Sequence, residues 1–497
     1  MVLTCNFKKN TMKKYILLVC ATIALLSFGA CSKDFLDKDP LDRLSSDQYW
    51  KSKADFDMAL TAIYGQLQNS IFSYGSPNWD VLTDNGYGQH NYNGSQGMVR
   101  GEIFPSTEGY VTDIYNACYS GIARANIFLA KLAAYEGGEL DDTSQARYEG
   151  EVRFMRAYYY YLLYACYGAV PIITEPLTLD NQMQAKASAS EVLMQTLADL
   201  DAAIANLGSD LYAGGGGHAV RTSAQALKLR VLMYAAYGEN GIPNEEILTE
   251  ASNLAREIMT AGYTLAPAFE SVFRDATQEG NPEIIFSIKF LAPDNATSMD
   301  QWYGDWAVVS PLPNMFNAFE EGDIRRDLTI FDREVNFGGV IHRPSNNVPT
   351  GYGLKKFLTP GLIPYGYSTQ SQQDWVMLRY AEVLLLFAEA ENELSGASEA
   401  ARDAVNALRE RANLRPIPPG LSKEDMRTAI RQERRVELAF EGLRYFDLKR
   451  WRIAEEVLNN VQDGILTYRF EERFYQWPLP QTEIDKSQGV LEQNPDY

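Results

Sequence analysis

Four consecutive tyrosines constrain the fold of this chain more than any other sequence feature. Tyr158, Tyr159, Tyr160 and Tyr161 lie within residues 148–167, which we expect to be helical. Four successive positions point to every side of a helix, and a helix that is apolar on all sides is covered on all sides. The sequence therefore predicts that this helix lies in the centre of a helical bundle.

Helical periodicity extends over most of the remaining chain. We expect a short strand at residues 284–288 and further helices at residues 46–68, 110–134, 190–207, 222–237, 245–261, 374–394, 398–412, 423–440 and 443–459. Helix pairs with small residues at their crossings are typical of tetratricopeptide (TPR) repeats, although the spacing here departs from the period of about 34 residues. The predicted fold class is all-α, a TPR-like helix-pair scaffold.

Two long irregular regions interrupt the helices, at residues 69–106 and 290–373. Both are rich in glycine, asparagine and aromatic residues. Loops of this length inside a compact domain are usually functional or disordered. We therefore expect the binding chemistry of the protein in these regions.

The charge balance excludes one large class of partner. The chain has 65 acidic and 45 basic residues, for a net charge of −20. The first thirty residues carry four lysines and no acid, so the net charge without them is −24. A chain this acidic repels phosphate backbones and anionic lipids, so we expect no nucleic-acid partner. The same charge favours neutral or cationic ligands over polyanionic glycans.

The N-terminus predicts export and lipid anchoring. Met12 is followed by two lysines, an apolar stretch at residues 15–28 that is too short to span a membrane, and Gly29, Ala30 and Cys31. We expect residues 1–30 to be a lipoprotein signal peptide with its true start at Met12, Cys31 to be lipidated, and residues 31–45 to form the tether. The alternative is ordinary secretion with an incidental cysteine.

Residues 32–40 suggest an export signal as well as a tether. Their sequence, SKDFLDKDP, resembles the Lys/Asp export signal that sends Bacteroidetes lipoproteins to the outside of the outer membrane. Phe35 interrupts the acidic pair of that signal. The alternative is that these residues form only a solvated tether.

The remaining chemistry-bearing residues indicate neither an enzyme nor a metal site. The three histidines and five cysteines are scattered, which excludes the usual zinc motifs, and neither a G-x-S-x-G elbow nor a D-x-D-x-D-G calcium loop occurs. With 65 acids, some pair of carboxylates is inevitable, so their number does not indicate a hydrolase. We expect no catalytic residue, metal or cofactor. Cys118 and Cys166 could form a disulfide, but we expect buried free thiols.

Several segments resemble the SusD/RagB family of outer-membrane nutrient-binding lipoproteins. They are FMRAYYY with GAVP (154–160, 168–171), LRYAEVLL to AEA (378–390), ERRVELAFEG with RYFDLKRW (433–442, 444–451), and WPLP with QNPDY (477–480, 493–497). The resemblance divides the mature chain into an N-terminal helical region, 46–265, and a C-terminal SusD/RagB region, 280–497. These motifs occur in the order typical of the family.

The resemblance implies a function and a partner. Members of the family act as lids over a SusC-type TonB-dependent transporter of the outer membrane. They capture an oligosaccharide, or in some members a peptide, and deliver it to the transporter. We therefore expect a lipid-anchored outer-membrane protein facing the cell exterior. The alternatives are the same lid role for peptides, a surface glycoside hydrolase, or a scaffold that binds only protein partners.

The charged residues of the motifs predict a structural ion-pair network. Arg434 with Glu437 and Glu441 with Arg444 have the spacing of ion pairs on one helix. Buried charges persist only when they are paired, so these residues are expected to hold helices together and not to catalyse a reaction. The predicted network comprises Glu382, Glu389, Glu433, Arg434, Arg435, Glu437, Glu441 and Arg444.

The candidate ligand-binding residues come from the two irregular regions. A flat ring covers the C–H face of a sugar, while amides and carboxylates bind its hydroxyl groups. A single ring more often packs in a core, and Trp79 is the one that we most expect there. In family members the binding aromatics fall in corresponding regions. The candidates are Trp79, Asp84, Asn85, Tyr87, His90 and Tyr92 in the first region, and Trp302, Tyr303 and Trp306 in the second.

Overall fold

The computed structural model describes residues 49–75, 78–209, 211–212, 215–238, 240–462 and 465–497. The chain divides into two units, Met1–Phe56 and Asp57–Tyr497. The predicted signal peptide (1–30), Cys31 and the tether (31–45) lie outside the described residues. In the described part, no helix is both long enough and apolar enough to cross a membrane.

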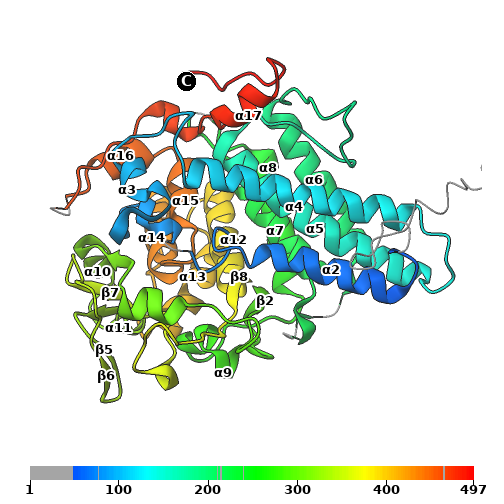
Figure 1. Ribbon diagram of the computed structural model, residues 1–497. Coiled ribbons are helices and arrows are strands. Elements are labelled where there is room, and N and C mark those ends of the chain that lie inside the picture. The colour runs from blue at the N-terminus through cyan, green and yellow to red at the C-terminus, as the bar shows by residue number, and fades with distance from the viewer. Residues whose placement is uncertain (1–48, 76–77, 210, 213–214, 239, 463–464) are drawn as a thin grey trace, which may run out of the picture. The chain divides into compact units, whose positions relative to one another are not determined.

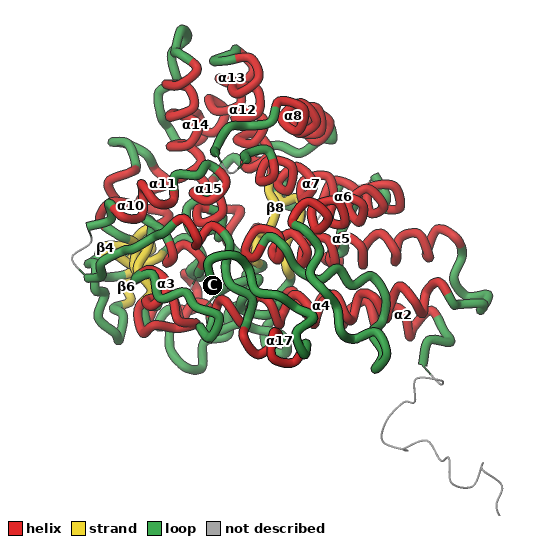
Figure 2. The backbone as a smooth tube through the Cα atoms, turned by 90° about the horizontal axis from the view of Figure 1, so that it is seen from above, coloured by secondary structure: helices red, strands yellow, loops and turns green. Residues whose placement is uncertain are grey.

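Long helices form most of the structure, as predicted (Figure 1). Neighbours along the chain pack on one another from α4 to α8, and α12 then packs on α8, α13 and α14, which is the arrangement of a TPR-like scaffold (Figure 2). The long helices are α2 (Lys53–Leu67), α4 (Tyr110–Ala133), α5 (Asp142–Tyr167), α6 (Ala189–Asn206), α7 (Arg221–Ala235), α8 (Glu245–Met259), α12 (Tyr380–Ser395), α13 (Glu399–Arg411) and α14 (Lys423–Glu437).

Helix α5 is the central helix that the tyrosine run predicts. The side chains of Tyr158–Tyr161 are all buried, and the helix packs on both α4 and α6. A glycine permits the close approach of α4, because a Cβ atom at Gly121 would lie 2.3 Å from the ring of Tyr159. Cys118 and Cys166 are buried free thiols, as expected.

Short strands pair in four places among the described residues, always antiparallel. Figure 1 shows most of them on the side of the molecule away from α5 and α6. The pairs are β1 (Gly86–Gly88) with β3 (Val309–Pro311), β2 (Ile284–Ile288) with β8 (Trp375–Arg379), β4 (Ile330–Asp332) with β7 (Tyr352–Leu354), and β5 (Val335–Phe337) with β6 (Val340–His342).

Two predicted helices differ in the structure. Residues 375–379 form strand β8 instead of the start of a helix, because their buried apolar run pairs with β2, and helix α12 begins only at Tyr380. The helix expected at residues 443–459 is divided into α15 (Arg444–Arg450) and α16 (Ala454–Asn459). Arg452 lies between them with a left-handed φ of 56°, which ends the helical path.

Short helical segments fill the irregular regions and the connections. In the first region these are η2 (Trp79–Leu82), η3 (Gln89–Gly94) and α3 (Ser95–Val99). The second region contains η6 (Gln301–Asp305), α10 (Pro313–Ala318), α11 (Ile324–Thr329) and η7 (Pro360–Leu362). The others are η4 (Gly215–Gly217), η5 (Phe269–Phe273), α9 (Asp275–Gln278), η8 (Glu472–Tyr475) and α17 (Gln481–Lys486).

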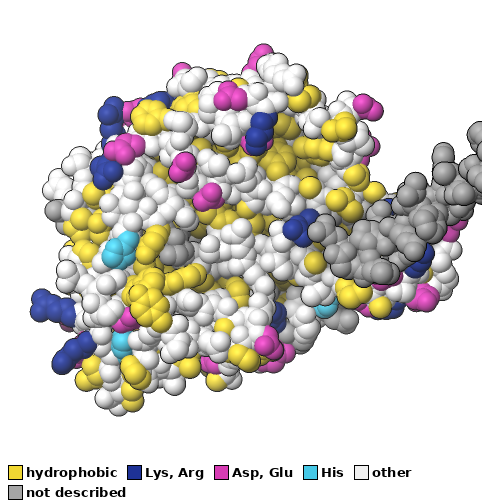
Figure 3. All heavy atoms as spheres, in the orientation of Figure 1, with side chains coloured by type: hydrophobic (Ala, Val, Ile, Leu, Met, Phe, Trp, Pro, Cys, Tyr) yellow, Lys and Arg dark blue, Asp and Glu magenta, His cyan; other side chains and the backbone are white. Residues whose placement is uncertain are grey.

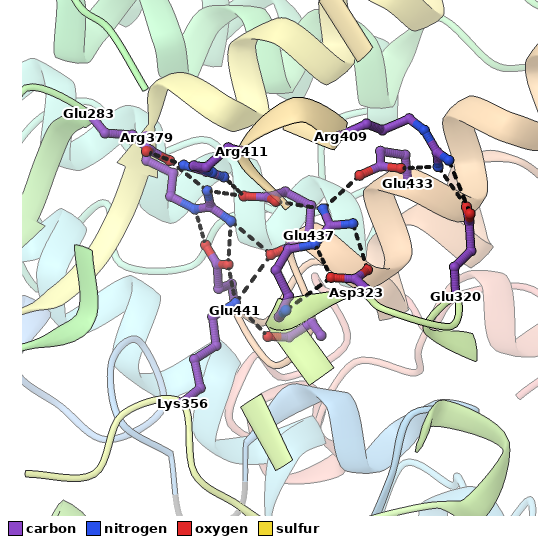
Figure 4. Close-up of polar contacts among 12 residues, drawn as sticks. Glu283, Glu320, Asp323, Lys356, Arg379, Arg409, Arg411, Glu433, Glu437 and Glu441 are labelled. Carbon is purple, nitrogen blue, oxygen red and sulfur yellow. Dashed lines mark hydrogen bonds and ion pairs between the residues drawn. The ribbon is translucent and has the colours of Figure 1, made fainter. Parts of the chain in front are cut away.

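A buried ion-pair cluster around Glu437 joins the C-terminal elements (Figure 4). The carboxylate of Glu437 is fully buried and accepts hydrogen bonds from Arg379 at 2.6 Å, from Arg325 at 2.8 Å and from Arg411. Burial alone would raise the pKa of Glu437, but the three guanidinium groups hold it well below the usual range. The cluster thus ties α11, β8 and α13 to the end of α14.

The cluster continues on both sides of Glu437. Lys356 and Arg379 bind Glu441, while Arg325 and Arg409 bind Glu433. The carboxylates of Glu283, Asp323 and Glu320 complete it at the edges. Because nearly all these charges are buried, each must keep its partners, and the cluster fixes how the elements meet.

The two ion pairs predicted within one helix do not form. Arg434 instead binds Asp447 at 2.8 Å and lies 3.5 Å from Glu382, because its side chain points into the protein and not along the helix surface. Buried carboxylates and guanidinium groups take several partners from different elements, which helical spacing cannot show. The other partners are Arg230 for Glu382, Arg450 for Glu389, Arg379 and Lys356 for Glu441, and Asp84 for Arg435 and Arg444.

Candidate functional site

The structure buries the polar candidates of the first irregular region. Asp84 accepts hydrogen bonds from Arg444 and contacts Arg435 at 3.0 Å, and these arginines lower its pKa although burial would raise it. Asn85 donates to Asp80 at 2.8 Å and accepts from Arg435 at 2.9 Å. Both side chains are therefore used to hold the first region against α14 and α15, and the expectation of ligand contact is wrong for them.

Three of the aromatic candidates also pack inside the protein. Tyr303 has no exposed surface and donates to the carbonyl of Gly75 at 2.8 Å. Tyr87 is buried, and its hydroxyl accepts from Gln96. The indole of Trp79 donates to the carbonyl of Ile71 and packs among the rings of Tyr110, Tyr445, Phe446 and Trp477. Burial removes Tyr87 and Tyr303 from contact with a ligand, and the half-buried ring of Trp79 is packed against other rings.

His90 and Tyr92 are exposed on a loop with an unusual backbone. His90, Asn91 and Asn93 all have left-handed φ angles, at 69°, 53° and 51°. Such conformations cost free energy in residues other than glycine and persist where the surroundings impose them. Here a Cβ atom at Gly109 would lie 2.0 Å from the carbonyl oxygen of Asn93, so the loop requires glycine beside it.

Strand pairing brings this loop to the second irregular region. Tyr87 pairs with Ser310 in the β1–β3 ladder, and the amide of Gln89 then donates to the carbonyl of Val308 at 3.0 Å. The residues that follow β1 therefore lie beside the turn that precedes β3. Trp302 and Trp306, both half-buried, belong to that turn.

Trp306 is the centre of an exposed aromatic cluster. Its ring meets the ring of Tyr367 edge to face at 5.4 Å, and Tyr367 is 88% exposed. The side-chain amide of Asn346 lies 3.2 Å from His90 Nε2 and donates to the carbonyl of Trp306 at 3.3 Å. We call His90, Tyr92, Trp306, Asn346 and Tyr367 the aromatic platform. Figure 3 shows hydrophobic side chains gathered between histidines on the left of this face.

Asp305 holds the segments of the platform together. Its carboxylate accepts from the backbone amide and the hydroxyl of Ser345, both at 2.9 Å, and lies 3.2 Å from His342 Nε2. Burial lowers the pKa of His342 more than Asp305 raises it, so the ring is neutral at pH 7. His342 also packs against Tyr365 at 4.8 Å, two residues before Tyr367.

Sequence reasoning missed two members of the platform. Asn346 and Tyr367 lie 40 and 61 residues after Trp306, in a region without periodicity. The signal that could have indicated Tyr367 is its place after Gly366 and directly before the polar run at residues 368–374. Their proximity to Trp306 depends on contacts that only the folded chain makes.

The side chains of the platform are of the kinds that bind a ligand. Flat rings cover apolar faces of a ligand, and the amide and imidazole groups beside them can hydrogen-bond its polar edges. Across the described ranges, no group of three or more histidine, cysteine, aspartate or glutamate side chains is arranged to hold a metal ion.

A hollow of about 490 Å³, separate from the platform, lies between α4, residues 171–184 and α17. Its lining is chiefly aliphatic, with Ile127, Leu177 and Met183 exposed at its edge. The hydroxyl of Tyr119 on its wall already donates to the carbonyl of Pro171. Polar side chains, among them Gln182, Glu483 and Lys486, line the hollow as well.

The sequence profile of the SusD family matches residues 270–497, and a second profile, described as starch-binding associating with the outer membrane, matches residues 34–232. SusD-like protein P2 of Formosa agariphila is 25% identical over 523 aligned residues, covering 98% of this chain and 100% of that protein. The chain belongs to the SusD/RagB family, as its motifs predict.

Solved structures share the fold. A SusD-like protein from Bacteroides fragilis superposes with a TM-score of 0.77 and 23% identity, over 93% of this chain and all of that one. Surface glycan-binding protein A from Bacteroides thetaiotaomicron, in complex with laminarihexaose, gives a TM-score of 0.73 and 21% identity, over 89% of this chain and all of that one. These similarities confirm the all-α, TPR-like SusD fold.

Proposed function

We propose that this chain is a non-catalytic nutrient-binding protein that captures an oligosaccharide on the aromatic platform. The observation that carries the proposal is the pair formed by the exposed ring of Tyr367 and the half-buried ring of Trp306, beside the amide of Asn346. Rings exposed in this way gain free energy when a sugar covers them, and the amide provides hydrogen bonds that orient it. Of the residues that the sequence suggests, His90, Tyr92 and Trp306 belong to the platform, and Trp302, half-buried in the same turn, stays a candidate beside it.

The comparisons support a carbohydrate ligand. One matching family is described as starch-binding, and a neighbour with the same fold carries laminarihexaose in its structure. Two neighbours are described as a laminarin-binding SusD-like protein and a surface glycan-binding protein, which supports a role without catalysis. A peptide ligand is the alternative that the family resemblance leaves open.

The cellular role follows from the family and the N-terminus. The family's description associates it with the outer membrane. We propose that a lipid on Cys31 anchors the chain there, facing the cell exterior. The protein would deliver its ligand to a SusC-type TonB-dependent transporter and act as the lid of that transporter.

Calorimetry of the mature chain, from Ser32 onward, tests the proposal. Laminarihexaose, a panel of polysaccharides and peptide digests are titrated into the wild type and into a Trp306→Ala/Tyr367→Ala variant. We expect at least one glycan to bind, and the double variant to bind it more than about tenfold more weakly, the loss typical of truncated aromatic anchors. Phe104→Ala, which removes an exposed ring outside the platform, is the matched control.

Each other outcome contradicts a specific part of the proposal. Binding of peptides alone would replace the glycan by a peptide as the captured ligand. A double variant that binds glycan as the wild type does would exclude the platform. Cleavage products in the titrated mixtures would show that the protein is an enzyme.

A further inference from the structure

An open pocket of about 360 Å³ adjoins the aromatic platform. Asn346 lines this pocket and is also the residue that bridges His90 and Trp306. The other polar lining residues include Arg333, Glu334, Arg343 and Asn347. We call it the arginine pocket, because two of its three charged lining residues are arginines.

Both arginines of the pocket are largely free to bind a ligand. The side chains of Arg333 and Arg343 are 85% and 81% exposed. Arg343 donates one hydrogen bond to Glu334 at 3.0 Å, whereas Arg333 lies 3.7 Å from Asp332, beyond hydrogen-bond distance. A guanidinium group has five N–H donors, so these contacts leave most of the donors available.

The backbone around the arginine pocket is held in place and partly strained. Arg333 has a left-handed φ of 60°, which is unfavourable for a long side chain, and its amide donates to the carbonyl of Gly351. The β5–β6 hairpin, at the lower left of Figure 1, closes through Gly338 and Gly339, both with positive φ. Strain that the fold maintains at an exposed charged residue is typical of a binding site.

The arginine pocket is joined rigidly to the platform. In the hairpin Val335 pairs with His342, which places Glu334 across from Arg343. His342 and Ser345, on either side of Arg343, both contact Asp305, the neighbour of Trp306. Asn346 follows Arg343 by three positions, so their Cα atoms lie at most about 10 Å apart. One extended ligand can therefore contact both the arginine pocket and the platform.

We propose that the arginine pocket binds the acidic group of a sugar unit next to the one that stacks on the platform. The ligand would then be an anionic glycan that carries a carboxylate or a sulfate ester. Guanidinium groups bind both anions through paired, charge-assisted hydrogen bonds, which are stronger than those to the hydroxyl groups of a neutral sugar. This inference rests on the proposed function, because it assumes that the platform holds a glycan.

The two arginines of the pocket have the opposite charge to the chain as a whole. At −20, most of the surface repels an acidic glycan. Arg333 and Arg343 place two exposed cationic groups beside the platform, with Asp332 and Glu334 as their acidic neighbours. Figure 3 shows basic side chains projecting at the left edge of the face, next to the hydrophobic side chains and histidines. The preference for neutral or cationic ligands that the composition suggests therefore does not extend to this site.

Calorimetry with matched oligosaccharides tests the inference. The ligands are a neutral set including laminarihexaose, an oligogalacturonide set for carboxylates and a carrageenan oligosaccharide set for sulfate esters. We expect the wild type to bind one acidic set at least about tenfold more tightly than the neutral set, because charge-assisted hydrogen bonds discriminate on this scale. The preference should weaken with added salt.

Two double variants separate the arginine pocket from general charge. Arg333→Gln/Arg343→Gln should lose the preference and keep the affinity for neutral glycan. Arg256→Gln/Arg469→Gln removes the same charge from exposed arginines outside the pocket and should keep the preference. Thermal unfolding of each variant checks that the fold is intact.

The outcomes distinguish the inference from the proposed function. If no acidic set is preferred, or if the preference survives loss of Arg333 and Arg343, the inference is overturned and the platform is unaffected. If Trp306→Ala/Tyr367→Ala leaves all glycan binding unchanged, the proposed function itself fails. A preference for only one acidic set identifies the carboxylate or the sulfate as the group that is bound.

Discussion

The buried ion-pair cluster and the aromatic platform are built in the same way, but the cluster stabilises the fold whereas the platform is a candidate binding surface. Each joins segments that are far apart in the sequence, and each depends on polar contacts between them. In the cluster, the carboxylate of Glu437 is fully buried and its oxygens bind three arginines. On the platform, the ring of Tyr367 and the imidazole of His90 are open to solvent. Side chains whose charges and hydrogen-bonding groups are paired with one another stabilise the fold, whereas side chains exposed to solvent can bind a ligand.

The largest effect is expected where the cluster loses its central charge. Glu437→Gln leaves Arg325, Arg379 and Arg411 close together without their shared counter-charge. We expect the free energy of unfolding to fall by about 5 kcal/mol, the upper range for a broken buried pair. Urea unfolding measures this, with Glu410→Gln, an exposed residue of α13, as the control. If the free energy of unfolding falls no more in this variant than in Glu410→Gln, the cluster does not hold the elements together.

Substitution by alanine of two aromatic residues of the second irregular region should lower stability to very different degrees. Tyr303→Ala opens a cavity in the core, and we expect it to lower the free energy of unfolding by about 4 kcal/mol. Trp306→Ala should change stability by less than about 1 kcal/mol, because the ring is half-exposed. Thermal and urea unfolding of the two variants check this. Equal losses would contradict the distinction between core and platform.

Acid should weaken the buried ion pairs more than the platform. Burial would raise the pKa of Glu389, but Arg450 lowers it to about 2, below the unfolded value near 4.5. The stabilisation is therefore complete above about pH 5 and is lost as pH falls toward 2, amounting to about 3 kcal/mol. Burial raises the pKa of Asp80 and Asp300 to about 6, and their protonation acts in the opposite direction.

Urea unfolding across this pH range, in the wild type and in Glu389→Gln, isolates the contribution of Glu389. The variant should show a flatter decline between pH 5 and 2, since it lacks the carboxylate that titrates. Parallel curves for the two proteins would exclude Glu389 as a source of acid sensitivity.

The smallest effect is expected at the bridge of the platform. Asn346→Ala removes the contacts to His90 and to the carbonyl of Trp306 without removing a ring. We expect glycan affinity to fall about fivefold, equivalent to one hydrogen bond of about 1 kcal/mol. Asn116→Ala, an exposed asparagine of α4, is the control in the same calorimetric titration. An unchanged affinity would remove Asn346 from the binding surface.

Helical periodicity predicted the long helices, because each buries one continuous face and the pattern that records this face is local. It failed at residues 375–379, where a buried strand and a buried helix have the same apolar run. It also failed for the ion pairs of Arg434 and Glu441, since their partners lie on other elements. A local sequence pattern does not show which distant residue a side chain will contact.

The candidate site could be predicted only as a region. The aromatic content of residues 290–373 indicated a binding surface, yet Tyr303 and Trp306, three residues apart, have opposite environments. One turn of backbone decides which of the two rings points into the core. Asn346 and Tyr367 were not predicted, because no short-range pattern links them to Trp306.

The sequence by itself determined the family, the helical scaffold and the central position of α5, because these depend on local periodicity and on motifs contiguous in the chain. Only the tertiary structure decided which aromatic rings stay exposed and which charges are paired. Those outcomes depend on contacts across tens to hundreds of residues, such as Arg435 with Asn85 and Asn346 with His90. Burial is a property of the folded chain, and burial separates the core of this protein from its candidate binding surface.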